Sequence, residues 1–306
     1  MARKRPAPAR KATPGRAEEP RAPAAFRSPR QVLAEVWGWF QPASLAELHA
    51  ALLRGDGDED PRSPRGPFDF RPAAVLAVAA VLLTLMEYTG YSSNFRAWFP
   101  AAHSDPRWGE LFGMLWWAGV RFGGFVALPF LAVTLLFDRP LTSFGLRLRG
   151  AGRHLAVYGA MLLVVAPLVL FFSRTDRFRA TYPFYRLADR SLLDFLAWEA
   201  AYILQFFGVE FFFRGFLLHG TKRQLGAYAI AVSIVPYCMI HFGKPLPETL
   251  GSIIAGTVLG VLSLRTRSIW AGFLVHVSVA VGMDVLSIAQ GLPAAASKYS
   301  ALAGLP

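Results

Sequence analysis

Long apolar runs, separated by short polar stretches, fill the chain from about residue 72 onward. These runs lie near the ~20 residues that a helix needs to cross a hydrocarbon core, and they do not alternate apolar and polar positions as barrel strands do. The pattern therefore predicts an all-α fold, a polytopic transmembrane helical bundle with about seven spans. The spans are expected near residues 72–92, 112–137, 154–173, 192–219, 227–242, 249–264 and 268–289.

The residues before and after these spans follow a different pattern. Residues 1–30 are mainly Ala, Pro and basic residues, which is typical of a disordered basic tail. In residues 31–71 a mixed apolar and charged stretch, interrupted at Pro42, predicts interfacial amphipathic helices, and a charged linker rich in Gly and Pro follows it. A transmembrane domain is thus expected over residues 72–290, with a C-terminal tail at 291–306. No short apolar segment directly follows the basic tail, so we expect no cleavable signal peptide.

Composition favours a membrane protein over a soluble or nucleic-acid-binding one. Of the residues, 54% are hydrophobic and only 17% are charged, which leaves too little polar surface for a soluble chain of this length. The net charge of +12 comes mainly from the tail and from short linkers beside the spans. Basic and aromatic residues form no recognised nucleic-acid motif, so we expect membrane lipid, and no nucleic acid, as a partner.

The distribution of Arg and Lys predicts how the chain crosses the membrane. With the N-terminus in the cytoplasm, the basic linkers around residues 139–153, 222–223 and 265–267 fall on the cytoplasmic side, as the positive-inside bias requires. We expect an integral protein of a bacterial inner membrane in this orientation. Residues 174–191 would then face outward although they carry five Arg, which conflicts with the bias.

Several ionisable residues lie inside the last four predicted spans, where a charged side chain costs about 2.5–3.5 kcal/mol on insertion scales. They are Glu199, Glu210, Arg214, His241, His276 and Asp284. Glu210 and Arg214 are four residues apart on one helical face, so each can neutralise the other, as a structural pair or as part of a site. Glu199 lies about 16 Å from Glu210 along the helix axis, too far to share one site.

The two histidines extend the Glu210–Arg214 pair into a set that can act on water. A carboxylate and one histidine could activate a water molecule while the other histidine stabilises an oxyanion. For each histidine alone, packing between helices is the alternative interpretation.

The order and spacing of these residues are similar to three motifs of a known family. Glu210-Phe-Phe-Phe-Arg214 is similar to its Glu-Glu-x-x-x-Arg motif, Tyr237-x-x-x-His241 to its Phe-x-x-x-His motif, and His276 to its His-x-x-x-Asn-like motif. On these motifs the chain resembles the CAAX-processing and bacteriocin-processing (Abi, or type II CAAX) intramembrane proteases, over roughly residues 70–290. The resemblance implies an intramembrane endopeptidase that hydrolyses a peptide bond in a membrane-associated substrate, either a peptide or a lipidated protein.

Two positions depart from the family motifs. The first Glu of the family pair, which the family uses to activate water, is Val209 here, and the Asn-like position of the third motif is Ala280. Glu248 or Asp284 could supply the missing acid and the missing polar partner. Alternatively, Glu248 fits the first turn of a helix, where a carboxylate meets the helix dipole, and Asp284 could approach the outer interface.

The resemblance and the residues together give a candidate site with open questions. Its candidate catalytic residues are Glu210, Arg214, His241, His276 and Glu248. Glu210, His241 and His276 would also be an acceptable zinc set with one open position, whereas members of the family are also described as metal-independent glutamate proteases, so the cofactor is zinc or none. Val209 and Ala280 suggest an alternative function, a catalytically silent homologue that acts as a membrane scaffold or binding protein. A transporter that uses the buried charges as a relay is a third hypothesis.

Overall fold

The fold consists of helices and turns throughout the part of the chain that the structure describes. A computed structural model describes residues 28–55, 68–148 and 155–291 of the 306. The expected basic tail and C-terminal tail therefore lie almost wholly outside the described residues. The helices are α1 (Pro29–Trp39), α2 (Pro42–Arg54), α3 (Arg71–Thr89), α4 (Ser92–Trp98), α5 (Pro100–His103), α6 (Gly109–Phe122), the π-helix η1 (Gly123–Ala127), α7 (Leu128–Leu136), the 3₁₀-helix η2 (Leu141–Phe144), α8 (Leu155–Phe172), α9 (Asp176–Thr181), α10 (Leu192–Glu210), the π-helix η4 (Phe211–Leu217), α11 (Leu218–Leu225), α12 (Tyr228–Met239), α13 (Leu246–Thr266) and α14 (Trp270–Ala289).

Seven apolar helical segments occupy the positions at which seven spans were predicted. Five are long and apolar enough to cross a membrane: Arg71–Thr89, Gly109–Leu136, Leu192–Leu225, Leu246–Thr266 and Trp270–Ala289. The other two are the shorter apolar helices Val157–Phe172 and Tyr228–Met239. The predicted all-α polytopic membrane bundle is thus confirmed.

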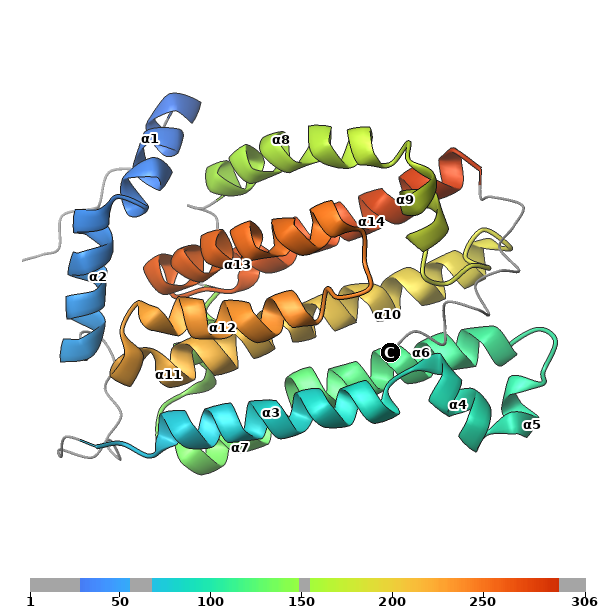
Figure 1. Cartoon of the computed structure of the whole chain (residues 1–306), viewed down its shortest axis with the longest axis horizontal. Helices are drawn as coiled ribbons and strands as arrows, with labels where there is room; N and C mark the ends of the chain where they lie inside the picture. The colour runs from blue at the N-terminus through green and yellow to red at the C-terminus, as the bar shows by residue number, and fades with distance from the viewer. Residues whose placement is uncertain (1–27, 56–67, 149–154, 292–306) are drawn as a thin grey trace, which may run out of the picture.

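The continuous helical segment α10–η4–α11 forms the centre of the bundle. In its most apolar window 72% of the residues are buried, against 28–39% in the other four long segments. Figure 1 shows α3, α6 and α7 on one side of this segment and α12, α13, α14 and α8 on the other. The short α12 turns back into α13 well before the neighbouring ends of α10 and α14. The loop that follows α12 contacts the segment between α9 and α10, where Lys244 Nζ lies 5.5 Å from the centroid of the Phe184 ring.

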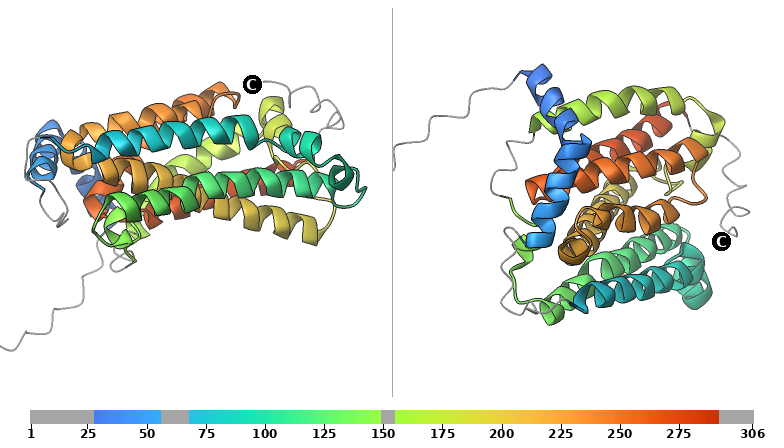
Figure 2. Two further views of the ribbon diagram at one scale, coloured as in Figure 1. Left: turned by 90° about the horizontal axis from the view of Figure 1, so that it is seen from below. Right: turned by 60° about the vertical axis from the view of Figure 1, so that its left-hand side comes forward.

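The N-terminal helices α1 and α2 cross one end of the bundle, and Figure 2 shows them from two further sides. On α1, Val32 and Val36 pack into a cluster with residues of α8, α13 and α14. On α2, the Nδ1 atom of His49 accepts a hydrogen bond of 3.1 Å from the backbone N–H of Ala227. Two helices thus form in the stretch predicted to hold them, with Pro42 in the first turn of α2. That they lie at the membrane interface stays a prediction.

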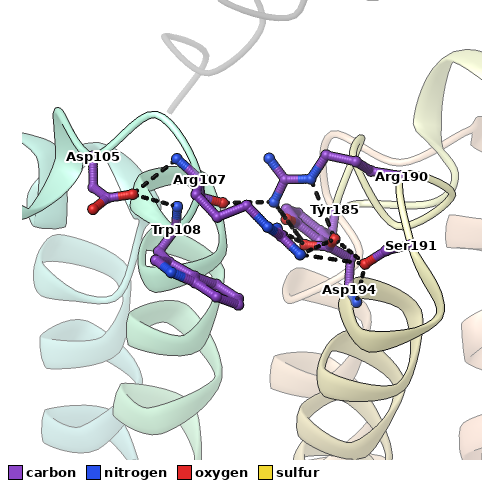
Figure 3. A network of polar contacts seen from close by, with 7 residues as sticks. All are labelled: Asp105, Arg107, Trp108, Tyr185, Arg190, Ser191 and Asp194. Carbon is purple, nitrogen blue, oxygen red and sulfur yellow. Dashed lines mark hydrogen bonds and ion pairs between the residues drawn. The ribbon is translucent and has the colours of Figure 1, made fainter.

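The five Arg of residues 174–191, which conflicted with the charge bias, are partly neutralised by contacts at the opposite end of the bundle. The fully buried Asp194 carboxylate accepts hydrogen bonds from Arg107 at 3.0 Å, Arg190 at 2.7 Å and the Tyr185 hydroxyl at 2.8 Å (Figure 3). Arg186 donates to backbone carbonyls, including that of Tyr182 at 2.9 Å. Arg186 and Arg190 therefore serve local structure, and the orientation of the chain in the membrane stays a prediction.

We expect Asp194→Asn to lower the free energy of unfolding by about 3 kcal/mol, because it removes the buried carboxylate that accepts from the buried Tyr185 hydroxyl and from Arg107 and Arg190. Unfolding of the protein in mixed micelles, followed by Trp fluorescence, measures this loss. Asp176→Asn is the matched control, since the Asp176 side chain is 97% exposed in its ion pair with Arg179 and should contribute less than about 1 kcal/mol. Equal losses in both variants would contradict a structural role for Asp194.

Candidate functional site

The Glu210–Arg214 pair lies where the central helix changes from α to π geometry. Glu210 is the last residue of α10, and Arg214 lies in η4, the kind of π-helical turn that often occurs at functional sites. The Arg214 Nη1 atom is 3.1 Å from Glu210 Oε1, and the side chains are only 2% and 1% exposed. Fully buried Phe211, Phe212 and Phe213 follow Glu210 directly. The pair is therefore enclosed in an apolar wall.

Helix α14 brings His276 to the same carboxylate. The His276 Nδ1 atom is 2.9 Å from Glu210 Oε1, and the His276 side chain is 16% exposed. Gly272, one turn earlier on α14, makes this approach possible, because a Cβ atom there would lie 2.1 Å from Glu210 Oε2. Arg214 and His276 thus both approach Oε1 of Glu210. Gly272 is a site residue that the sequence did not predict.

Tyr237 on α12 contacts both histidines. Its hydroxyl is 2.8 Å from His276 Nε2, and its backbone carbonyl is 2.8 Å from His241 Nδ1. A carbonyl oxygen can only accept, so His241 carries its proton on Nδ1 and has a lone pair on Nε2. Among the described residues no hydrogen bond to His241 Nε2 is formed. The structure therefore brings Glu210, Arg214, His241 and His276 around one tyrosine.

Exposure divides these residues into two layers. Glu210, Arg214 and Tyr237 are each no more than 2% exposed, whereas His241 and His276 are partly exposed. The histidine edges are the parts of the cluster that a bound molecule can reach. The carboxylate and the guanidinium are buried, so they act through the residues that they contact.

The comparisons with known proteins concern the part of the chain that carries this cluster. Residues 191–281 match the family model of the Rce1-like type II CAAX prenyl endopeptidases. The resemblance predicted from the three motifs is thereby confirmed over this segment, which we call the Rce1-like segment. A search of the curated proteins gives no match, and a search of the solved structures gives none either.

The two positions at which the Rce1-like segment departs from the family motifs are both apolar and buried. Val209 is 3% exposed and belongs to the main hydrophobic cluster together with residues of α3, η1 and η4. Ala280 is 4% exposed and packs in a second cluster that includes Trp198 and Tyr202. Neither position places a polar group at the histidines.

Glu248, a candidate for the missing acid, is engaged at the start of α13. Its carboxylate oxygens each accept from the Tyr182 hydroxyl at 2.7 Å, and Lys244 Nζ lies 2.7 Å from Oε1. Burial and the adjacent Glu248 raise the pKa of Tyr182 well above its usual value, so this hydroxyl stays protonated and donates. Among the described residues, Glu248 makes these contacts with Tyr182 and Lys244 and with neither histidine of the site. Glu248 lies in the first turn of α13, which is the structural role that the sequence predicted as the alternative for this residue.

Asp284, the candidate for the missing polar partner, is engaged with residues of α10. Its side chain is fully buried and accepts a hydrogen bond of 2.7 Å from Trp198 Nε1. Glu199, also buried, interacts with it from α10. Its neighbours on α10 therefore enclose Asp284 inside the bundle, and its position relative to the outer interface stays a prediction. His276 lies eight residues, about 12 Å along the helix, from Asp284.

A zinc site was one of the two cofactor hypotheses, and the donor set does not fit it. Across residues 28–55, 68–148 and 155–291, no group of three or more His, Cys, Asp and Glu side chains is placed so that it could hold a metal ion. His276 has both ring nitrogens occupied, by Glu210 and by the Tyr237 hydroxyl. His241 directs Nδ1 to its own helix. The set of Glu210, His241 and His276 therefore offers only one open nitrogen, where zinc needs three protein ligands.

Proposed function

We propose that this chain is an intramembrane endopeptidase that hydrolyses a peptide bond of a membrane-associated substrate. The observation that carries the proposal is that Tyr237 contacts both His276 and His241, whose Nε2 is open, in a segment that matches a CAAX prenyl endopeptidase family. A histidine with one anchored N–H and one free lone pair is a suitable general base. The substrate class, a lipidated or membrane-proximal peptide, follows from the family match alone.

His241 takes the place of the absent carboxylate as base in this proposal. Its Nε2 accepts a proton from water while the water oxygen attacks the scissile carbonyl carbon, which converts the carbonyl oxygen to an oxyanion. The proton then passes from Nε2 to the leaving nitrogen as the carbon–nitrogen bond breaks. In this proposal Glu210 and Arg214 do not reach the water; Glu210, paired with Arg214, holds the ring of His276. No metal is needed for any of these steps.

We expect His241→Ala to lower kcat for cleavage of a membrane-anchored peptide by about 10²–10⁴-fold, the usual contribution of a general base. Proteolysis in detergent micelles, with prenylated and unmodified forms of one peptide, measures the loss. His103→Ala is the matched control, because His103 lies in α5 outside the Rce1-like segment. Glu248→Gln tests the remaining carboxylate, and we expect less than about a threefold change. Cleavage that survives in His241→Ala would overturn the assignment of the base.

A catalytically silent homologue is the second candidate, and the apolar burial of Val209 and Ala280 favours it. Such a protein would retain the same helix packing and bind a membrane segment without cutting it. Absence of cleavage by the wild type, together with retention of the peptide by wild type and by His241→Ala alike, is the result expected for this alternative. Cleavage by the wild type rules it out.

A further inference from the structure

Tyr237 makes three separate contacts inside the candidate site although its position matches an apolar Phe in the family motif. Its hydroxyl contacts His276, its carbonyl contacts His241, and its ring lies under the Arg214 guanidinium, with 3.9 Å from Cζ to the ring centroid. The side chain is 2% exposed, so it does not reach a bound substrate. Its influence on a reaction would pass through the residues that it holds.

The hydroxyl group sets the state of His276. A carboxylate offers only lone pairs, so the His276 Nδ1 atom that faces Glu210 carries a proton. In the neutral ring Nε2 is then an acceptor, and the Tyr237 O–H donates to it at 2.8 Å. If the ring becomes an imidazolium, the same hydroxyl oxygen can accept from Nε2–H. A hydroxyl therefore keeps the contact in both charge states, which neither a Phe at 237 nor the methyl group of Ala280 can do.

Packing against α13 and η4 fixes the ring of Tyr237. A Cβ atom at Gly256 of α13 would lie 3.1 Å from Tyr237 Cδ1, so the absence of a side chain there lets α13 lie directly against the ring. The Phe213 ring meets it at a centroid distance of 5.2 Å. The orientation of the hydroxyl is thus determined by the packing between α12, α13 and η4.

We propose that Tyr237 is the positioning residue of this site. Its hydroxyl takes the place of the polar side chain that the family motif has at position 280, where this chain has Ala280. This inference rests on the proposed endopeptidase function for its catalytic consequence, but the hydroxyl–histidine contact is independent of that function. Tyr237 holds His276 between its hydroxyl and Glu210. Through its carbonyl it also keeps the free lone pair of His241 on Nε2.

Tyr237→Phe tests the proposal, because it removes the hydroxyl and retains the ring and the carbonyl. We expect kcat to fall about 10–100-fold with KM changed less than about threefold, as for loss of a group that orients a reacting side chain. We also expect diethylpyrocarbonate, read by peptide mass spectrometry, to modify His276 several-fold faster, since Nε2 loses its partner while the ring stays 16% exposed. The rate at His241 should remain unchanged, because the carbonyl contact persists.

Tyr185→Phe is the matched control, since it also removes a fully buried hydroxyl that donates to a neighbour, at 2.8 Å from Asp194. It should leave kcat and the modification of His276 within about twofold of the wild type. An unchanged rate of His276 modification in Tyr237→Phe would overturn the proposal. An equal increase of this rate in Tyr185→Phe would also overturn it, because the increase would then come from a general loss of packing. If the wild type cleaves no peptide, the proposed function fails, and the modification rates still decide the role of Tyr237.

Discussion

Arg214→Met is expected to lower the free energy of unfolding by about 3–5 kcal/mol, the range found when one partner of a buried ion pair is removed. The physical reason is that Glu210, at 1% exposure, would keep its charge in an apolar wall with only His276 beside it. Unfolding in mixed micelles, followed by Trp fluorescence, gives the difference. Arg96→Met, which removes an exposed Arg from α4, is the control and should change stability by less than about 0.5 kcal/mol.

A double variant separates the ion pair from mere loss of packing. Glu210→Gln combined with Arg214→Met leaves no buried charge at either position, so most of the lost stability should return. If the double variant is as unstable as Arg214→Met, the loss comes from the volume and the stacking of the guanidinium on Tyr237. The pair would then have no electrostatic role in the fold.

Gly272→Ala is expected to abolish the present arrangement of the Glu210 carboxylate, because the new methyl group would lie 2.1 Å from Glu210 Oε2 in the unrelaxed structure. Insertion of a methyl group into a packed site typically costs about 1–3 kcal/mol. The displaced carboxylate would also release His276, so modification of His276 by diethylpyrocarbonate should rise and any peptidase activity should fall at least tenfold.

The same helix supplies a control for Gly272→Ala. A Cβ atom at Gly282, ten residues later on α14, would meet nothing within 4 Å. Gly282→Ala should therefore be neutral or stabilising by up to about 1 kcal/mol, as expected for a change from Gly to Ala inside a helix. Equal effects of the two substitutions would mean that the close approach of Gly272 to Glu210 does not matter in solution.

Local sequence rules predicted the helices and one contact of the site. Apolar length placed the spans, and a spacing of four residues predicted the pairing of Glu210 with Arg214. In both cases the residues concerned belong to one continuous helical segment. Their relative placement is therefore fixed by helical geometry alone.

The remaining contacts of the site join residues that are far apart in the sequence. His276 meets Glu210 across 66 positions and the Tyr237 hydroxyl across 39. Such contacts depend on how α10, α12 and α14 pack, and no local pattern encodes that packing. For the same reason the sequence did not predict the contact of Asp284 with Trp198, which lies on α10. The sequence did contain an indication of the role of Tyr237. The chain has Tyr where the family motif has Phe, and it also lacks the Asn-like residue of the third motif.

The short length of α12 has a consequence for the lipid around the protein. Its 12 residues extend about 18 Å, whereas a bilayer core is about 30 Å thick. The polar turn that follows, with His241 and the Lys244–Glu248 ion pair, therefore creates a hydrophobic mismatch on this side of the bundle. Local thinning of the leaflet, with entry of its headgroup water, would relieve such a mismatch and hydrate the exposed edge of His241. The acyl-chain length of the host membrane thus becomes a physical variable of the site.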